Sequence, residues 1–588
     1  MNNATQINEH FQSIARLLAN RQLKQALDEL NTFVKDVPEW DLHTQFESIQ
    51  TAYHYMLQYF KQNASDPQRA RLYTDLLRQT CVLNERLMVA QYELVSSELF
   101  YSTRREQKQN PHTLADYRLQ LETFAEDMAM TRLLHQGDQL QTELDRLRGN
   151  HESAQNALFC KVWTSSLWDA NTLEEARKFL QSMLIPTNDT ALFTSAVTMG
   201  LLQVFDARKF HFLFDAYSHS DLQVNQRALV GLVIACLYYE DRLAIEPELL
   251  ARLKLLQEQP NFTSNLLEIQ IQLLRIRETK KADRKMRDEI IPEVIKSSRN
   301  LRNSKINFIE LDEESFLNDK NPEWKKWEEN TNLTNKMQEL GNMQMEGIDV
   351  YMSTFAQLKT FPFFRNICNW FYPFDPQHSA VLQVFSEEEQ KSNFIVRGIL
   401  SSPYFCNSDK YSFCFTVQNI PAKQREMFSA NLNEQSELAQ DAAEMVKAEQ
   451  PTAGIISRQY LQDLYRFFKV YPRRHEFTDI FETLQLNFQE SSILRPLLHE
   501  NDARRKVAEY LFYKEYYTEA MHMFESLTQE TETDAELYQK LGFCYQKNKD
   551  YHKAIEAYRQ ADLRKADTLW TIRHLAQCHR LMKEPEAA

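Results

Sequence analysis

One short segment of the chain combines side chains that could take part in covalent chemistry. It contains two thiols, Cys406 and Cys414, together with Asp409, Lys410 and Tyr411. A thiolate is a nucleophile, and a nearby lysine can lower the pKa of a thiol. No histidine that could act as a base lies near in sequence, so we expect these residues to be structural. An enzyme or small-molecule site within residues 346–420 remains an alternative.

The motifs of common catalytic and metal sites are missing from the sequence. The chain has 9 glycines, where average usage predicts about 41. It contains no GxxxxGK[ST] or GxGxxG phosphate loop, no GxSxG nucleophile turn and no HExxH pair. Its 15 histidines lack metal-site spacing, and its 8 cysteines form no CxxC pair. We therefore expect no catalytic residue, no metal and no cofactor.

The charge of the chain argues against general nucleic-acid binding. The net charge is −14, with 82 acidic and 68 basic residues, whereas binding to phosphates requires a positive surface. Residues 275–305 nevertheless carry eleven Lys or Arg against five acidic residues, and residues 309–329 carry three against eight. A solvated basic helix followed by a loop is the ordinary interpretation. Two alternatives remain: nucleic-acid or anion binding by the basic segment, and an acidic connector that folds onto it.

The C-terminal region repeats itself at a spacing of 34 residues. Residues 501–534 and 535–568 match position by position, and a third copy begins at Leu569. This pattern of large, small and aromatic residues resembles the tetratricopeptide repeat (TPR), in which pairs of antiparallel helices stack. The resemblance implies that the repeated residues pack the helices together, and these are Val507, Ala508, Ala520, Phe524, Leu541, Gly542, Tyr545, Ala554, Tyr558 and Ala561.

The TPR resemblance also implies a concave groove formed by the first helix of each pair. Residues of these helices that are not needed for packing would contact a partner protein: Arg505, Phe512, Tyr513, Gln539, Phe543, Gln546, Lys547, Trp570, Arg573, Gln577 and Arg580. Cations beside aromatic and amide side chains suit an extended or helical peptide with acidic and apolar residues. Glu509 and Phe543 stand where the chaperone-binding TPR proteins have asparagine, so we do not expect that ligand. Alternatively, these residues face solvent or other helices of the chain.

The remainder of the chain is also expected to be helical, as an all-α solenoid of stacked antiparallel helix pairs. Ala26, Leu30, Phe33 and Pro38 resemble part of a TPR unit, and residues 221–232 resemble the inner helix of a HEAT repeat. Alternating aromatic residues predict non-helical structure for residues 401–417. The predicted division is 1–150 N-terminal helical hairpins, 151–280 HEAT-like repeats, 281–345 charged connector, 346–500 aromatic-rich junction and 501–588 TPR array.

The sequence predicts a cytoplasmic protein that does not enter a membrane. Its N-terminus lacks the basic and apolar regions of a secretory signal. Its longest apolar run, residues 228–239, is much shorter than the ~20 residues that span a bilayer. Scattered cysteines are expected to be buried, reduced thiols.

The predicted function is that of a non-catalytic protein-interaction scaffold. Leu575 and Ala576 take the positions of Leu541 and Gly542, and Ala588 falls on the position of Ala554. The third repeat would thus stop early in its second helix, without a capping helix. We therefore expect the sequence to be a fragment of a protein whose array continues.

Overall fold

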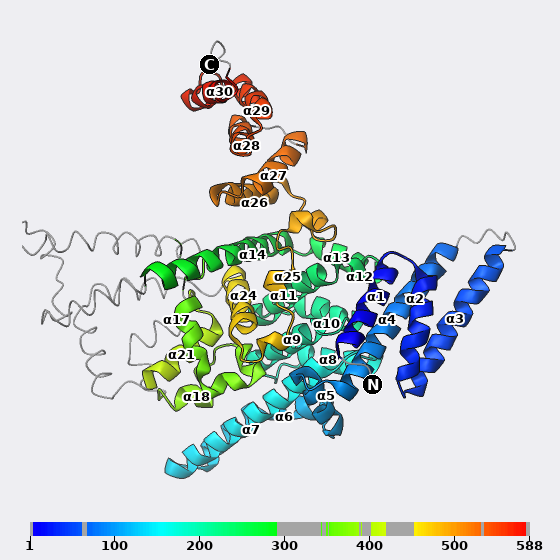
Figure 1. The fold of residues 1–588 in the computed structure, drawn as a ribbon. Helices are drawn as coiled ribbons and strands as arrows, with labels where there is room; N and C mark the ends of the chain where they lie inside the picture. The colour runs from blue at the N-terminus through cyan, green and yellow to red at the C-terminus, as the bar shows by residue number, and fades with distance from the viewer. Residues whose placement is uncertain are drawn as a thin grey trace, which may run out of the picture. The chain divides into compact units, whose positions relative to one another are not determined.

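The computed structural model describes residues 4–61, 68–290, 343, 348–350, 352–386, 390, 402–418, 452–530 and 534–583. Regular structure in these ranges is entirely helical, which confirms the predicted all-α fold class (Figure 1). The contacts divide the chain into a first unit, 1–250 with 275–484, and a second unit, 251–274 with 485–588. The predicted acidic connector, the third-repeat residue Ala588 and residues 291–305 of the basic segment lie outside the described residues.

The first unit begins with four helices that share one apolar core. They are α1 (Ala4–Ala19), α2 (Leu23–Phe33), α3 (Trp40–Lys61) and α4 (Arg69–Val95). Ile14, Leu18, Ala26, Leu30 and Phe33 are all buried in this core. These residues recur at helical spacing and therefore lie on the buried faces of α1 and α2.

A longer series of helices follows in the chain. It comprises α5 (Leu99–Gln109), α6 (Leu114–Leu134), α7 (Gly137–Thr164), α8 (Ala170–Gln181), α9 (Thr187–Leu201), α10 (Ala207–Tyr217), α11 (Leu222–Tyr238), α12 (Glu240–Leu243), α13 (Pro247–Leu255) and α14 (Phe262–Lys285). Asp206 and Asp221 cap α10 and α11 by accepting hydrogen bonds from the first backbone N–H groups. Among the described residues, no helix is both long and apolar enough to cross a membrane.

Short helices make up the aromatic-rich part of the first unit. They are α17 (Met352–Ala356), η7 (Gln357–Thr360), η8 (Pro362–Arg365), η9 (Ile367–Trp370) and α18 (Ser379–Leu382), followed by α21 (Asn407–Gln418), α24 (Ala453–Val470), η10 (Arg474–Glu476) and α25 (Ile480–Thr483). The prediction of non-helical structure at 401–417 is wrong, because α21 covers most of this range. Tyr411, Ser412, Cys414 and Phe415 are all buried, and a helix covered on several sides need not show the helical period.

Contacts between segments that are distant in sequence hold the first unit together. The Ser457 hydroxyl of α24 donates to the side-chain oxygen of Gln226 in α11 at 2.7 Å. The Leu99 backbone N–H, at the start of α5, donates to Glu476 Oε2 at 2.6 Å across 377 residues of sequence. The unit is therefore complete only when both its early and its late segments are in place.

The helices of the second unit follow one another at a regular spacing. After η11 (Phe488–Glu490) and η12 (Arg495–Leu497) come α26 (Asn501–Tyr513), α27 (Tyr517–Glu530), α28 (Ala535–Lys547), α29 (Tyr551–Arg564) and α30 (Leu569–Leu581). The first helices α26, α28 and α30 begin 34 residues apart, at positions 501, 535 and 569. Each helix packs against the next one in the chain. The period in the sequence is thus also a period of the structure.

The turn after each first helix has the same backbone conformation. Glu515, Lys549 and Lys583 have φ of 65°, 66° and 63°, in the left-handed region that side chains disfavour. In the first two turns the next N–H donates back to a carbonyl of the helix, from Tyr516 to Leu511 and from Asp550 to Tyr545, at 2.9 Å. Left-handed residues commonly end helices in this way. Glycine is the usual residue at such a position, whereas this glycine-poor chain has glutamate and lysine there.

Candidate functional site

The repeated residues of the second unit form its interior. Buried positions include Val507, Ala508, Ala520, Phe524, Leu541, Gly542, Tyr545, Ala554, Tyr558 and Ala561. At Gly542 an added Cβ would lie 2.7 Å from two ring carbons of Tyr558. The glycine therefore allows the tyrosine ring to pack directly against α28. These residues position the helices on which the predicted partner-binding side chains stand.

Aromatic side chains from successive first helices contact one another. The ring centroid of Phe543 in α28 lies 5.6 Å from that of Phe512 in α26 and 6.1 Å from that of Trp570 in α30. It also lies 5.5 Å from the ring of His574, which is 4.1 Å from Trp570. We call Phe512, Phe543, Trp570 and His574 the aromatic row. His574 was not among the predicted residues, although its position four residues after Trp570 places both on one helix face.

Two predicted cations lie beside the aromatic row. Lys547 is exposed, and its Nζ lies 5.1 Å from the ring centroid of Phe543. Arg573 is exposed on α30. Burial, together with the positive charges of Arg573 and Lys547, lowers the pKa of His574 below its usual value. Two positively charged side chains therefore act on His574 in this part of the row.

Arg505 is instead bound by carboxylates of the chain. Its Nη1 lies 2.9 Å from Asp534 and its Nε donates to Glu509 at 3.0 Å. Lys540 joins the same group, with Nζ 3.1 Å from Glu509 and 2.7 Å from Glu536. Lys540 was not among the predicted residues. Its partner Glu509 lies on the preceding first helix, and the sequence does not show that the two side chains meet. An acidic peptide at Arg505 would have to compete with these ion pairs.

The predicted amides Gln539 and Gln546 bind side chains of other helices in the repeats. Gln539 donates from Nε2 to the Thr571 hydroxyl at 2.8 Å, which links α28 to α30. The Tyr558 hydroxyl donates to Gln546 Oε1 at 2.8 Å. Of the other predicted residues, Tyr513 and Arg580 are exposed and Gln577 is half-buried. The surface open to a partner therefore consists of the exposed part of the aromatic row and the exposed cations near it.

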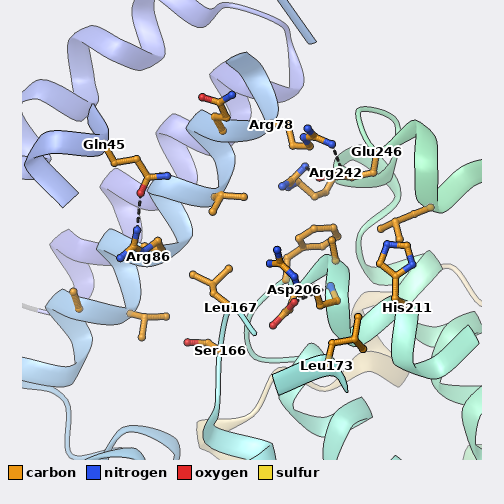
Figure 2. A pocket seen from close by; sticks show the side chains of 18 of the residues that line it. Gln45, Arg78, Arg86, Ser166, Leu167, Leu173, Asp206, His211, Arg242 and Glu246 are labelled. Carbon is orange, nitrogen blue, oxygen red and sulfur yellow. Dashed lines mark hydrogen bonds and ion pairs between the residues drawn. The ribbon is translucent and has the colours of Figure 1, made fainter. Parts of the chain in front are cut away.

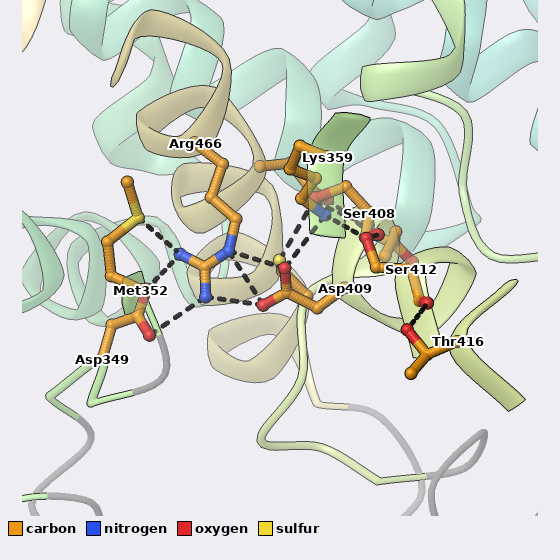
Figure 3. Close-up of polar contacts among 11 residues, drawn as sticks. Asp349, Met352, Lys359, Ser408, Asp409, Ser412, Thr416 and Arg466 are labelled. Carbon is orange, nitrogen blue, oxygen red and sulfur yellow. Dashed lines mark hydrogen bonds and ion pairs between the residues drawn. The ribbon is translucent and has the colours of Figure 1, made fainter. Parts of the chain in front are cut away.

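The cluster considered for covalent chemistry lies inside the first unit. Arg466 binds Asp409 through Nε at 2.7 Å and also pairs with Asp349, and Lys359 Nζ lies 3.0 Å from Asp409 (Figure 3). Burial raises the pKa of the Cys406 thiol well above its usual value, and the thiol is 0% exposed. A thiol that is buried and protonated is a poor nucleophile. The geometry of these residues is that of a buried ionic network.

Only part of the predicted basic segment is described, at residues 275–290. Its cations include Lys281, which lies 3.0 Å from Glu278, and Arg287, which lies 2.7 Å from Asp283. These pairs satisfy basic groups within the helix itself.

The described residues contain no arrangement of three or more His, Cys, Asp or Glu side chains that could hold a metal ion. All eight cysteines are free thiols, and seven of them are buried. In comparisons with known proteins, no family model and no curated protein matches the chain.

Proposed function

We propose that this chain is a non-catalytic protein-interaction scaffold of the TPR type. A peptide segment of a partner protein would bind along the first helices α26, α28 and α30. The observation that supports this proposal most directly is the continuous aromatic row, with Lys547 and Arg573 beside it. Aromatic residues together with arginine are enriched at the energetically important positions of protein interfaces.

The chemistry of this surface defines the peptide that would fit. Trp570 is 39% exposed, so its ring can cover an apolar side chain of the partner. Lys547 and Arg573 can bind a carboxylate next to that side chain. The peptide would therefore carry an apolar residue beside an acidic one. We place this function in the cytoplasm, where scattered cysteines stay reduced.

The proposal can be tested by affinity purification with the full chain as bait. The double variant Phe543→Ala with Arg573→Ala removes the centre of the aromatic row and one cation. We expect at least a tenfold loss of the proteins recovered, since central interface residues each contribute a few kcal/mol. Circular dichroism spectra and melting curves would verify that the variant is folded.

A matched control changes an arginine and a large apolar residue outside the row. Arg559 and Leu563 on α29 are both exposed, and Leu563 is 78% exposed. The double variant Arg559→Ala with Leu563→Ala should recover partners as well as the wild type does. If the aromatic-row variant is folded and still recovers the same partners, the proposed binding surface is wrong.

A further inference from the structure

A second surface of the molecule has the features of a small-molecule site. A cleft of about 740 Å³ opens within the first unit (Figure 2). Side chains of α3 and α4 form one wall, and the loop at 166–167, the start of α10 and α12 form the facing one. Its volume lies in the range of about 300–1,000 Å³ that is usual for ligand pockets.

Cations from separate elements line this cleft. They are Arg78, Arg86, Arg104, Lys108, Arg208 and Arg242. Five carboxylates also line it, of which two bind cations of the same cleft and a third caps a helix. Glu93 binds Arg104 at 3.1 Å and Lys108 at 2.5 Å, Glu246 binds Arg242, and Asp206 caps α10. The other two, Glu39 and Glu248, are exposed.

Arg242 has an unused hydrogen-bond donor at this site. Its side chain is only 10% exposed, and its guanidinium lies 4.3 Å above the ring of Phe205. Nη1 donates to Glu246 at 2.6 Å and Nε to Glu85 at 3.3 Å, whereas Nη2 has no hydrogen-bond partner. A buried donor that remains unsatisfied destabilises a fold. A bound anion that reaches this guanidinium would remove the penalty.

Two further arginines of the cleft also have N–H donors that could bind an anion. Arg86 donates to Gln45 at 2.7 Å and to Asp41, and Arg208 donates through Nη1 to the Trp168 carbonyl at 2.7 Å. A guanidinium has five N–H donors, so each retains capacity to bind an oxyanion. Figure 2 shows Arg86 and Arg242 on facing sides of the cleft. An oxyanion between these walls could bind donors from both.

The backbone is strained at the cleft wall. Leu167, which lines the cleft, has φ of 56°, a conformation that is unfavourable for a bulky side chain. Leu167 and the neighbouring Leu173 also provide an apolar surface beside the arginines.

We propose that this cleft binds a small phosphorylated molecule. Arg86, Arg208 and Arg242 would bind the phosphate oxygens, and Leu167 and Leu173 would pack against the organic part. A phosphate offers several oxygens and more than one negative charge, which suits convergent arginines. This site is independent of the proposed peptide-binding surface, because its residues all lie between positions 39 and 249 of the first unit.

The test is calorimetric titration of the full chain with two probes at physiological salt. Pyrophosphate tests the phosphate contacts alone, and ADP adds an organic group. We expect saturable binding of ADP with a submillimolar Kd and weaker binding of pyrophosphate. The double variant Arg86→Gln with Arg208→Gln should raise the Kd at least tenfold, since hydrogen bonds to charged groups are the strong ones.

The control is Arg146→Gln with Arg287→Gln, two arginines of the first unit whose side chains are 60% and 66% exposed and lie outside the cleft. It should bind the probes as the wild type does. Absence of saturable binding of both probes would overturn the proposal. Equal affinity in the cleft variant and the control would also overturn it, because the bound anion would then lie elsewhere.

Discussion

The repeats α26 to α30 differ from the first unit in how far apart in sequence their contacting residues lie. Within the repeats, Gln539 binds Thr571 across 32 residues, about one repeat. In the first unit, Arg466 binds Asp349 across 117 residues and Arg227 binds the Phe371 carbonyl across 144. A repeat array uses the same local contact many times, whereas the first unit depends on contacts that occur once.

The units also differ in where they place charge. Arg227, Lys209 and Arg466 are fully buried in the first unit, where they bind carbonyls, hydroxyls and carboxylates, although Nε and Nη2 of Arg227 have no hydrogen-bond partner. In the repeats, Arg505 and its carboxylate partners remain partly exposed. A charge that is buried with its partners is much more costly to disturb than one at the surface. We therefore expect the loss of one ion-pair partner to lower stability more in the first unit than in the repeats.

The largest effect is expected where one partner of the buried network is removed. Arg466→Met would leave Asp349 and Asp409 buried without their guanidinium, at a cost of about 3–5 kcal/mol. Hydrogen exchange of the α24 amides measures the loss of local stability. Arg505→Met, the counterpart in the repeats, should cost less than about 1 kcal/mol at α26. Equal losses of stability in the two variants would show that the buried ion pairs of the first unit are no more costly to disturb than the exposed ones of the repeats.

A smaller effect is expected from the titration of Lys209. Burial lowers the pKa of Lys209 to about 8, while its value in an unfolded chain is near 10.5. Between these values the unfolded state binds more protons, so the free energy of unfolding rises with pH. We expect the wild type to gain about 3 kcal/mol relative to Lys209→Met from pH 8 to 10.5, since each pH unit over which only the unfolded chain holds the proton contributes about 1.4 kcal/mol.

Urea titrations of both proteins across this pH range would measure the difference. Lys209→Met also loses the hydrogen bond from Nζ to the Ser165 carbonyl, but that loss shifts the stability difference equally at every pH. A stability difference that stays constant from pH 8 to 10.5 would mean that Lys209 titrates normally in the folded protein.

The smallest effect concerns packing in the repeats. In Gly542→Ala the new methyl group would press against the Tyr558 ring, so we expect a loss of about 1–3 kcal/mol at α28 and α29. Gly149 on α7 has no atom within 4 Å of an added Cβ. Gly149→Ala should therefore stabilise its helix by roughly 0.5–1 kcal/mol. Hydrogen exchange should become faster at α28 and α29 in Gly542→Ala and slower at α7 in Gly149→Ala.

The repeats can be predicted from the sequence better than the first unit can. The 34-residue period gives the starting positions of three first helices, and Asp221 correctly marks the beginning of α11. The helix α21 was missed because its buried faces hide the helical period. The network around Arg466 was also missed, because nothing local to position 466 indicates Asp349 or Asp409 as partners.

The candidate site could be predicted only in part for a similar reason. Residue type and repeat position identify Phe543 and Trp570, which do contact each other. They do not reveal that Arg505 is occupied by Asp534 and Glu509, since that depends on the stacking of one pair on the next. The arginine cleft of the first unit has no sequence motif, because its residues come together only in three dimensions.

The hydrogen bond between Leu99 and Glu476 has a consequence for how the protein is made. A ribosome releases the chain from its N-terminus at about 5–20 residues per second. The segment at α5 must therefore wait for more than 370 further residues, on the order of 20–80 seconds, before its partner exists. During that interval the apolar surfaces of the early helices are incompletely covered. The repeats face no such delay, because each helix meets its neighbour as soon as the next one emerges.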